Sequence, residues 1–123
     1  MGREIKFRVW DKALERFSFP DFLALNMLGE IVEVYDNFRG VEDGTPNKEV
    51  VLSQYTGRKD RNDEEIYEGD IMRAYNDFGD VFSQLTVVRF DQEKMEWKGV
   101  DWSDLKNEEV IGNIYENPEL LEV

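Results

Sequence analysis

The sequence predicts a mainly β protein, with an N-terminal hairpin and a C-terminal SH3-like or rolled β-barrel portion that carries short helical turns. At the N-terminus, Ile5, Phe7 and Val9 alternate with polar residues, which is the spacing of a half-buried strand. In the centre, Gly69-Asp70 predicts a turn that leads directly into an apolar strand, as at the start of many small SH3-like barrels. The C-terminal half then holds enough strand-like segments for a small barrel, at residues 71–75, 81–90, 94–98 and 110–115.

Length and composition predict a single domain over residues 1–123. With 41% apolar and 13% aromatic residues, the chain can bury a core. We find no internal repeat and no Pro- or Ser-rich linker. No apolar segment follows Met1 and none has membrane-spanning length, so we expect no membrane contact and a cytoplasmic location.

Residue types exclude most catalytic chemistry. The chain has no cysteine and no histidine, which excludes disulfides, thiolate nucleophiles, Cys/His zinc sites and imidazole acid–base catalysis. None of the serines lies in a Gly-x-Ser-x-Gly sequence, and the phosphate-binding glycine motifs are absent. No pair of carboxylates stands out for a hydrolase. We therefore expect a protein that is not an enzyme and needs no cofactor, with a carboxylate-based enzyme as a distant alternative.

The charge bears on partners. A formal net charge of −13 argues against direct nucleic-acid binding, which requires phosphate neutralisation. Acidity is explained most simply by solubility. The alternative is an acidic nucleic-acid mimic that occupies a DNA-binding host protein.

The N-terminal half holds one hairpin and one ambiguous block. Residues 4–10 and 16–19 predict the hairpin, with Trp10 on its more polar face, either packed under another part of the chain or exposed as an anchor. Residues 21–28 predict one or two helical turns or a buried loop. Residues 31–35 and 49–55 predict strands, and residues 36–48 a mobile loop.

The acidic stretch over residues 54–71 is read as a strand, a turn at Gly57 and a charged, mobile tip. Asp60-x-Asn62-x-Glu64 resembles the start of a calcium-binding EF-hand loop. The glycine that such a loop needs is replaced by Glu65, and its final glutamate by Ile71, so we expect no metal site.

The C-terminal half adds three details. The imperfect alternation at Val87-Val88 predicts a bulge or a strand buried on both faces. Ser103 is expected to cap a helical turn, and Asn117-Pro118 to start a single final turn.

A docking surface needs apolar or aromatic anchors, because exposed charge pairs contribute only about 0–1 kcal/mol each. Trp10, Trp97 and Trp102 are the candidate binding residues, since each lies beside a predicted turn. We expect at least one of them to be exposed beside a strand edge that can pair with a partner or with itself, which would make a homo-oligomer.

Several motifs in fixed order resemble the YopX-like family of phage and prophage proteins. They are Arg3 to Asp11, the central segment from Tyr55 to Ile71, Val88 to Phe90, and Val110 to Leu121. One departure is Asp63, where the family usually has glycine. The resemblance implies a small, mainly β protein, encoded by a phage or prophage, that acts inside a bacterial host. It assigns no catalytic or binding residue and no known biochemical activity. Our own leading hypothesis is an accessory protein that acts without catalysis by binding a host or phage macromolecule, with a protein as the expected partner.

Overall fold

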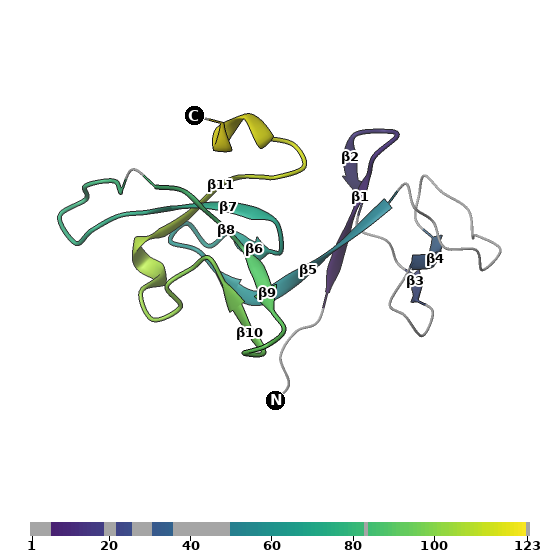
Figure 1. Ribbon diagram of the computed structural model, residues 1–123, viewed down its shortest axis with the longest axis horizontal. Coiled ribbons are helices and arrows are strands. Elements are labelled where there is room, and N and C mark those ends of the chain that lie inside the picture. The colour runs from purple at the N-terminus through teal and green to yellow at the C-terminus, as the bar shows by residue number, and fades with distance from the viewer. Residues whose placement is uncertain (1–5, 19–21, 26–30, 36–49, 83, 123) are drawn as a thin grey trace. The chain divides into compact units, whose positions relative to one another are not determined.

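The structure is a computed structural model that describes residues 6–18, 22–25, 31–35, 50–82 and 84–122 (Figure 1). The prediction of a mainly β protein is confirmed: short strands and two 3-10 turns make up its regular structure. The chain divides into two compact units, one over residues 6–53 and the other over residues 1–5 and 54–123. Within the described ranges, no helix is long and apolar enough to cross a membrane.

The predicted N-terminal hairpin is confirmed. Strand β1 (Phe7–Asp11) pairs antiparallel with β2 (Arg16–Ser18), with Trp10 opposite Phe17. The Asp11 carboxylate closes the connection by accepting hydrogen bonds from the backbone N–H groups of Ala13 and Leu14, at 2.9 and 3.0 Å. This is the local bonding by which aspartate favours turns.

The block at residues 21–28 is the largest error of the sequence interpretation. Phe22–Leu25 forms strand β3, which pairs antiparallel with β4 (Ile31–Tyr35). Its near-helical apolar spacing is overridden because a β-branched strand only a few residues away supplies a pairing partner. The loop expected over residues 36–48 lies outside the described residues.

The second unit is built from three pieces of sheet. Strand β7 (Asp70–Ala74) lies between β11 (Glu108–Asn113) and β8 (Thr86–Val87). Strand β9 (Arg89–Asp91) pairs with β10 (Glu96–Lys98). Strand β5 (Val50–Lys59), the end of which belongs to this unit, pairs with β6 (Glu65–Tyr67).

Strand β5 does not turn at Gly57, contrary to the expectation from the sequence. Gly57 has a φ of 91° and sits inside the strand, where the register with β6 shifts between Tyr55 and Lys59. A glycine accommodates such a bulge because it tolerates positive φ. The chain therefore bends within the strand and continues to Lys59.

Ile66, Met72 and Val88, each at most 1% exposed, form a hydrophobic cluster in the core of this unit. Partly buried side chains cover them, among them Trp97 and Trp102. At Val87-Val88 the sequence predicted a bulge or a strand buried on both faces; instead, β8 ends at Val87, Val88 lies between the strands and β9 begins at Arg89. This break turns the chain from one piece of sheet into the next.

The turn at Gly69-Asp70 is confirmed. Gly69 has a φ of 89°, and the Asp70 carboxylate accepts the Tyr67 backbone N–H at 2.7 Å. Gly69 also donates its N–H to the Val88 carbonyl and accepts the Ile114 N–H. The turn at Gly69 is thus hydrogen-bonded to two segments that are distant in sequence, at Val88 and at Ile114.

The tip between β5 and β6, which was expected to be mobile, forms hydrogen bonds within itself and to a distant strand. Asp60 is 7% exposed, and its Oδ1 accepts the backbone N–H groups of Asn62 and Glu64 at 2.8 and 2.9 Å. The Arg61 guanidinium lies 4.2 Å from the centre of the Tyr75 ring. Asp60 and Arg61 thus bind groups both within the tip and outside it.

The two short helical turns are present, but their caps differ from the prediction. The first, Leu105–Asn107, begins after Asp104, and the Ser103 hydroxyl donates to Asp101 Oδ1 instead of capping it. The second, Pro118–Leu121, is the expected single turn after Asn117. The Asn117 side chain accepts the Asn113 N–H, so it closes the end of β11.

Candidate functional site

Two of the three tryptophans proposed as anchors line the same hollow in the second unit. Trp97 comes from β10, and Trp102 from the segment that follows it. The other lining residues are Thr56 and Arg58 from β5 and Glu96 from β10. The hollow has a volume of about 230 Å³. We call it the Trp hollow.

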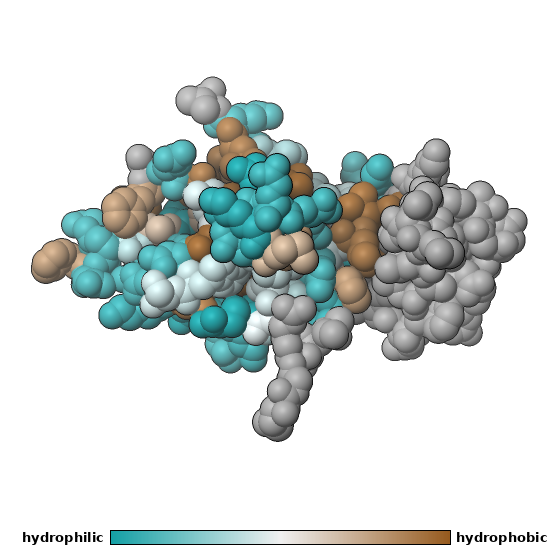
Figure 2. All heavy atoms as spheres, turned by 60° about the horizontal axis from the view of Figure 1, so that its bottom comes forward, coloured by the Kyte–Doolittle hydropathy of each residue, from teal (hydrophilic) through white to brown (hydrophobic). Residues whose placement is uncertain are grey.

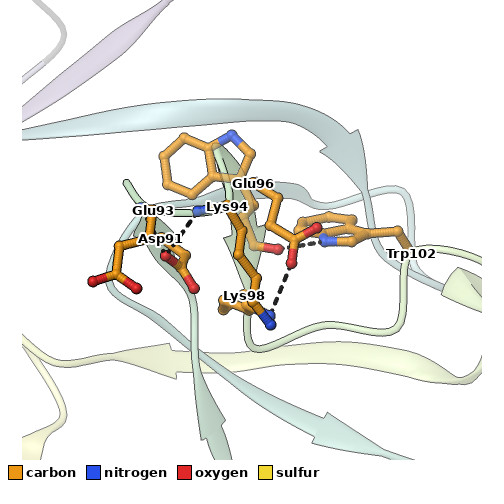
Figure 3. A network of polar contacts seen from close by, with 7 residues as sticks. Asp91, Glu93, Lys94, Glu96, Lys98 and Trp102 are labelled. Atoms are coloured by element: carbon orange, nitrogen blue, oxygen red, sulfur yellow. Dashed lines mark hydrogen bonds and ion pairs between the residues drawn. The ribbon is translucent and has the colours of Figure 1, made fainter.

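Hydrogen bonds fix the walls of the Trp hollow. The Trp102 indole N–H donates to the Trp97 carbonyl at 3.0 Å (Figure 3). The Thr56 hydroxyl donates to the Ile66 carbonyl at 2.8 Å, next to the core. Because both walls are held by backbone groups, the hollow is preformed and needs little ordering when a ligand enters.

Thr56 and Arg58 line the same hollow, as expected for residues two apart in a strand, which share a face. Gly57 lies between them with a φ of 91°, where the register with β6 shifts. The Arg58 side chain is exposed and supplies the positive charge of the rim.

Glu96, from β10, contributes a negative charge to the lining of the Trp hollow. Its carboxylate forms an ion pair with the Lys98 ammonium at 2.8 Å, and this hydrogen bond raises the pKa of Lys98 (Figure 3). The β9–β10 turn is tied by Asp91 Oδ1, which accepts the backbone N–H groups of Glu93 and Lys94. The lining thus combines two indole rings, an arginine and a glutamate that is paired with a lysine.

The lining of the Trp hollow suits the binding of an apolar group. An aromatic hollow of this size holds one apolar side chain or one ring of a ligand, while its polar rim selects what lies next to it. In the view of Figure 2, hydrophilic residues cover much of the described surface, and hydrophobic residues occur in separate groups. The Trp hollow is therefore a local apolar site on a polar protein.

Trp10 belongs to the unit over residues 6–53, whereas Trp97 and Trp102 belong to the other unit. It is 8% exposed, and its ring packs against Phe17 with centroids 5.0 Å apart. The Arg8 guanidinium lies 4.1 Å from the centre of the same Phe17 ring. Trp10 thus offers a partner little surface, whereas Trp97 and Trp102 are half-buried.

Phe78 is an exposed aromatic that the sequence interpretation missed. It is 92% exposed, in the connection between β7 and β8. The Asn76 side chain holds this connection by accepting the backbone N–H groups of Phe78 and Asp80, both at 2.9 Å. The sequence does contain a signal for this exposure. Phe78 lies between Asn76-Asp77 and Gly79-Asp80, which predict a tight turn, and so short a turn cannot bury an aromatic side chain.

Comparisons with known proteins give one family. A family model described as YopX protein matches residues 6–122. The fold is similar to that of protein EF1440 from Enterococcus faecalis, with 25% sequence identity and a TM-score of 0.73, over 98% of this chain and 100% of that one. It is also similar to protein yopX from Bacillus subtilis, with 22% identity and a TM-score of 0.58, over the same shares. No curated protein matches the chain.

Proposed function

Because the chain belongs to the YopX family, we propose that it is a phage or prophage accessory protein that binds a host or phage protein without catalysis. It acts in the cytoplasm of the bacterial host. The absence of cysteine and histidine from the sequence supports a non-catalytic role.

The Trp hollow is the observation that carries this proposal. Tryptophan and arginine are the residues most enriched among those that dominate binding energies, and a preformed cavity for one partner side chain is the usual setting. Truncating such an anchor typically costs 2 kcal/mol or more, roughly a thirtyfold loss of affinity. Trp97, Trp102 and Arg58 supply these residue types around one volume.

The chemistry of the Trp hollow suggests an apolar or aromatic side chain flanked by an acidic residue. The indoles take the apolar group, and Arg58 pairs with the carboxylate. Glu96 is already paired with Lys98, which lowers its demand for a partner cation. Phe78 offers a second, separate contact.

Charge reversal beside the Trp hollow tests the proposal. Arg58 and Lys59 are exposed neighbours on β5, but only Arg58 is among the residues that line the hollow. Immobilised wild type, Arg58→Glu and Lys59→Glu are incubated with lysates of Bacillus subtilis and Enterococcus faecalis, and the captured proteins are quantified by mass spectrometry. We expect a partner that the wild type and Lys59→Glu retain and that Arg58→Glu loses by about tenfold or more.

Two outcomes would contradict the assignment. Equal capture by all three proteins means that the interface does not include the Trp hollow. Capture of DNA-binding proteins that both variants retain or strengthen, and that disappears at high salt, favours the nucleic-acid mimic instead, because each charge reversal makes the protein more acidic. Sedimentation of the wild type alone tests whether the partner is a second copy of this chain.

A further inference from the structure

The connection between β7 and β8 presents an aromatic ring to solvent on a well-bonded turn. The Asn76 side chain accepts the backbone N–H groups of Phe78 and Asp80, and the Asn76 N–H donates to the Asp80 carbonyl at 2.9 Å. Figure 1 shows this connection extending beyond the strands to one side of the unit. We call residues 76–80 the Phe78 turn. Because hydrogen bonds already order it, little conformational entropy is lost when it meets a partner.

The Phe78 turn has no apolar contact surface of its own size within the chain. The Phe78 ring is 92% exposed, and it is not among the residues that line the Trp hollow of the same chain. Val81 and Phe82 follow in the same connection and are 51% and 55% exposed, so the apolar surface continues beyond the turn. Such a surface gains free energy when a second molecule removes it from water.

The two carboxylates of the Phe78 turn differ in how far other groups offset their charge. Asp77 Oδ1 lies 4.0 Å from the Lys106 ammonium and accepts a hydrogen bond from the Asn107 amide. Asp80 Oδ2 accepts a hydrogen bond from the neutral Asn76 amide at 3.2 Å. Among the described residues, no lysine or arginine forms an ion pair with Asp80. Its charge is therefore available to a cation of another molecule.

The Phe78 turn matches the chemistry of the Trp hollow. The hollow offers two indole rings to an apolar group and the exposed Arg58 to a carboxylate. Phe78 supplies a ring, and Asp80, two residues later, supplies the carboxylate. Glu96 repels an incoming carboxylate little, because it is paired with Lys98. A protruding turn and a hollow are also complementary in shape.

We propose that a second copy of this chain occupies the Trp hollow, with its Phe78 ring against Trp97 and Trp102 and its Asp80 carboxylate paired with Arg58. This inference rests on the proposed role of the Trp hollow as a binding site. The contact joins two different surfaces of the chain, so each copy can offer a turn and receive one. One ring and one ion pair bury less than the roughly 1,200 Å² of a stable interface, so the association is weak and depends on concentration.

Sedimentation velocity of the full chain tests the proposal. At an ionic strength of about 0.15 M, charges are screened beyond about 8 Å, which limits the repulsion between two copies that each carry a net charge of −13. Between about 10 μM and 1 mM, the sedimentation coefficient of the wild type should rise with concentration. Phe78→Ala should weaken the association by about thirtyfold or more, and Arg58→Glu by about tenfold or more.

Two control variants match these changes outside the proposed contact. Leu14→Ala shortens an apolar side chain that is 53% exposed in the turn between β1 and β2. Lys59→Glu reverses the charge of the exposed neighbour of Arg58, which does not line the Trp hollow. Both controls should associate like the wild type.

Mixing the two weakened variants tests whether two different surfaces meet. Phe78→Ala retains the Trp hollow, and Arg58→Glu retains the Phe78 turn, so their equimolar mixture should form dimers at concentrations where neither variant does alone. Exchanging the charges within one chain, as Arg58→Glu with Asp80→Arg, should also restore association, because the ion pair forms again with its signs reversed.

The proposal is overturned if the wild type stays monomeric to about 1 mM. It is also overturned if Phe78→Ala and Arg58→Glu associate like their controls, or if neither the mixture nor the charge exchange recovers association. Capture from lysate separates this failure from failure of the proposed function. A monomeric wild type that still captures a protein through Arg58 excludes only the second copy as occupant of the Trp hollow, whereas a monomeric wild type that captures nothing contradicts both.

Discussion

The carboxylate of Asp60 accepts a hydrogen bond from the backbone N–H of Val110, with an Oδ2–N distance of 2.8 Å across 50 residues of sequence. The other oxygen of the same carboxylate accepts the N–H groups of Asn62 and Glu64. In addition, the Arg61 N–H donates to the Glu108 carbonyl. One buried aspartate thus closes the charged tip and fastens it to β11.

Asp60→Asn should lower the free energy of unfolding by about 1–3 kcal/mol, because an amide presents a donor where the carboxylate accepts on both sides. The matched control is Asp63→Asn, three residues further along the tip. Asp63 has a φ of 64° and an 85% exposed side chain, and asparagine tolerates that backbone equally well. Urea denaturation of both variants measures the difference. Equal stabilities would show that the Asp60 bonds contribute nothing to the fold.

Gly69→Ala should destabilise the protein more than Gly79→Ala. Both glycines have positive φ, 89° and 86°, so alanine costs about 1 kcal/mol at each. A Cβ at Gly69 would also lie 2.8 Å from Tyr115 Cε2, whereas one at Gly79 meets nothing within 4 Å. We therefore expect a total loss of about 2 kcal/mol or more for Gly69→Ala. Thermal unfolding of the two variants side by side separates the ring contact from the backbone strain, and identical melting temperatures would contradict it.

Burial raises the pKa of Glu108 above its ordinary value, although the Asp101 backbone N–H donates to its Oε1, and this predicts a pH-dependent stability difference. A carboxyl group whose pKa is higher in the folded protein than in the unfolded chain stabilises the fold when the pH is below its pKa in the unfolded chain. This stabilisation is lost as the pH rises through its pKa in the folded protein. Asp101, Asp104 and Tyr75 are the titratable groups that line a small hollow with Glu108. Glu108→Gln removes the titration, so its stability relative to the wild type should rise as the pH increases from 4.5 and then level off. Urea midpoints from pH 4 to pH 8 measure it, with Glu119→Gln as control; a constant difference would show that Glu108 titrates normally.

The local parts of the fold were predictable from sequence because local chemistry determines them. The N-terminal hairpin follows from two-residue alternation, and the Gly69-Asp70 turn from a glycine with an adjacent carboxylate. Phe22–Leu25 was misassigned because a four-residue apolar strand has too few residues to show its period. The bonded tip was missed because its fastening depends on Val110, which no local pattern connects to Asp60.

The candidate sites were only half predictable. Trp97 and Trp102 were proposed from residue type and line one hollow, but Arg58, which lines it too, was not proposed, and the Gly57 bulge was interpreted as a turn. The burial of Glu108 gave no signal at all, since Asn-Glu-Glu-Val resembles many solvated segments. It results from β11 pairing with β7, where Glu108 lies opposite Ala74. Features that form through strand pairing become visible only when the register is known.

The corner at Gly69 has a consequence for how fast the chain can fold. Backbone bonds from Glu68 and Gly69 reach Gln54, Val88 and Ile114, so this corner is complete only after several chain segments have closed onto it. Closing each loop of chain costs conformational entropy before the hydrogen bonds at the corner can form. Proteins rich in contacts between residues distant in sequence therefore fold in about milliseconds to seconds. Gly69→Ala should then mainly accelerate unfolding and leave the refolding rate nearly unchanged, because a corner assembled last is absent from the transition state.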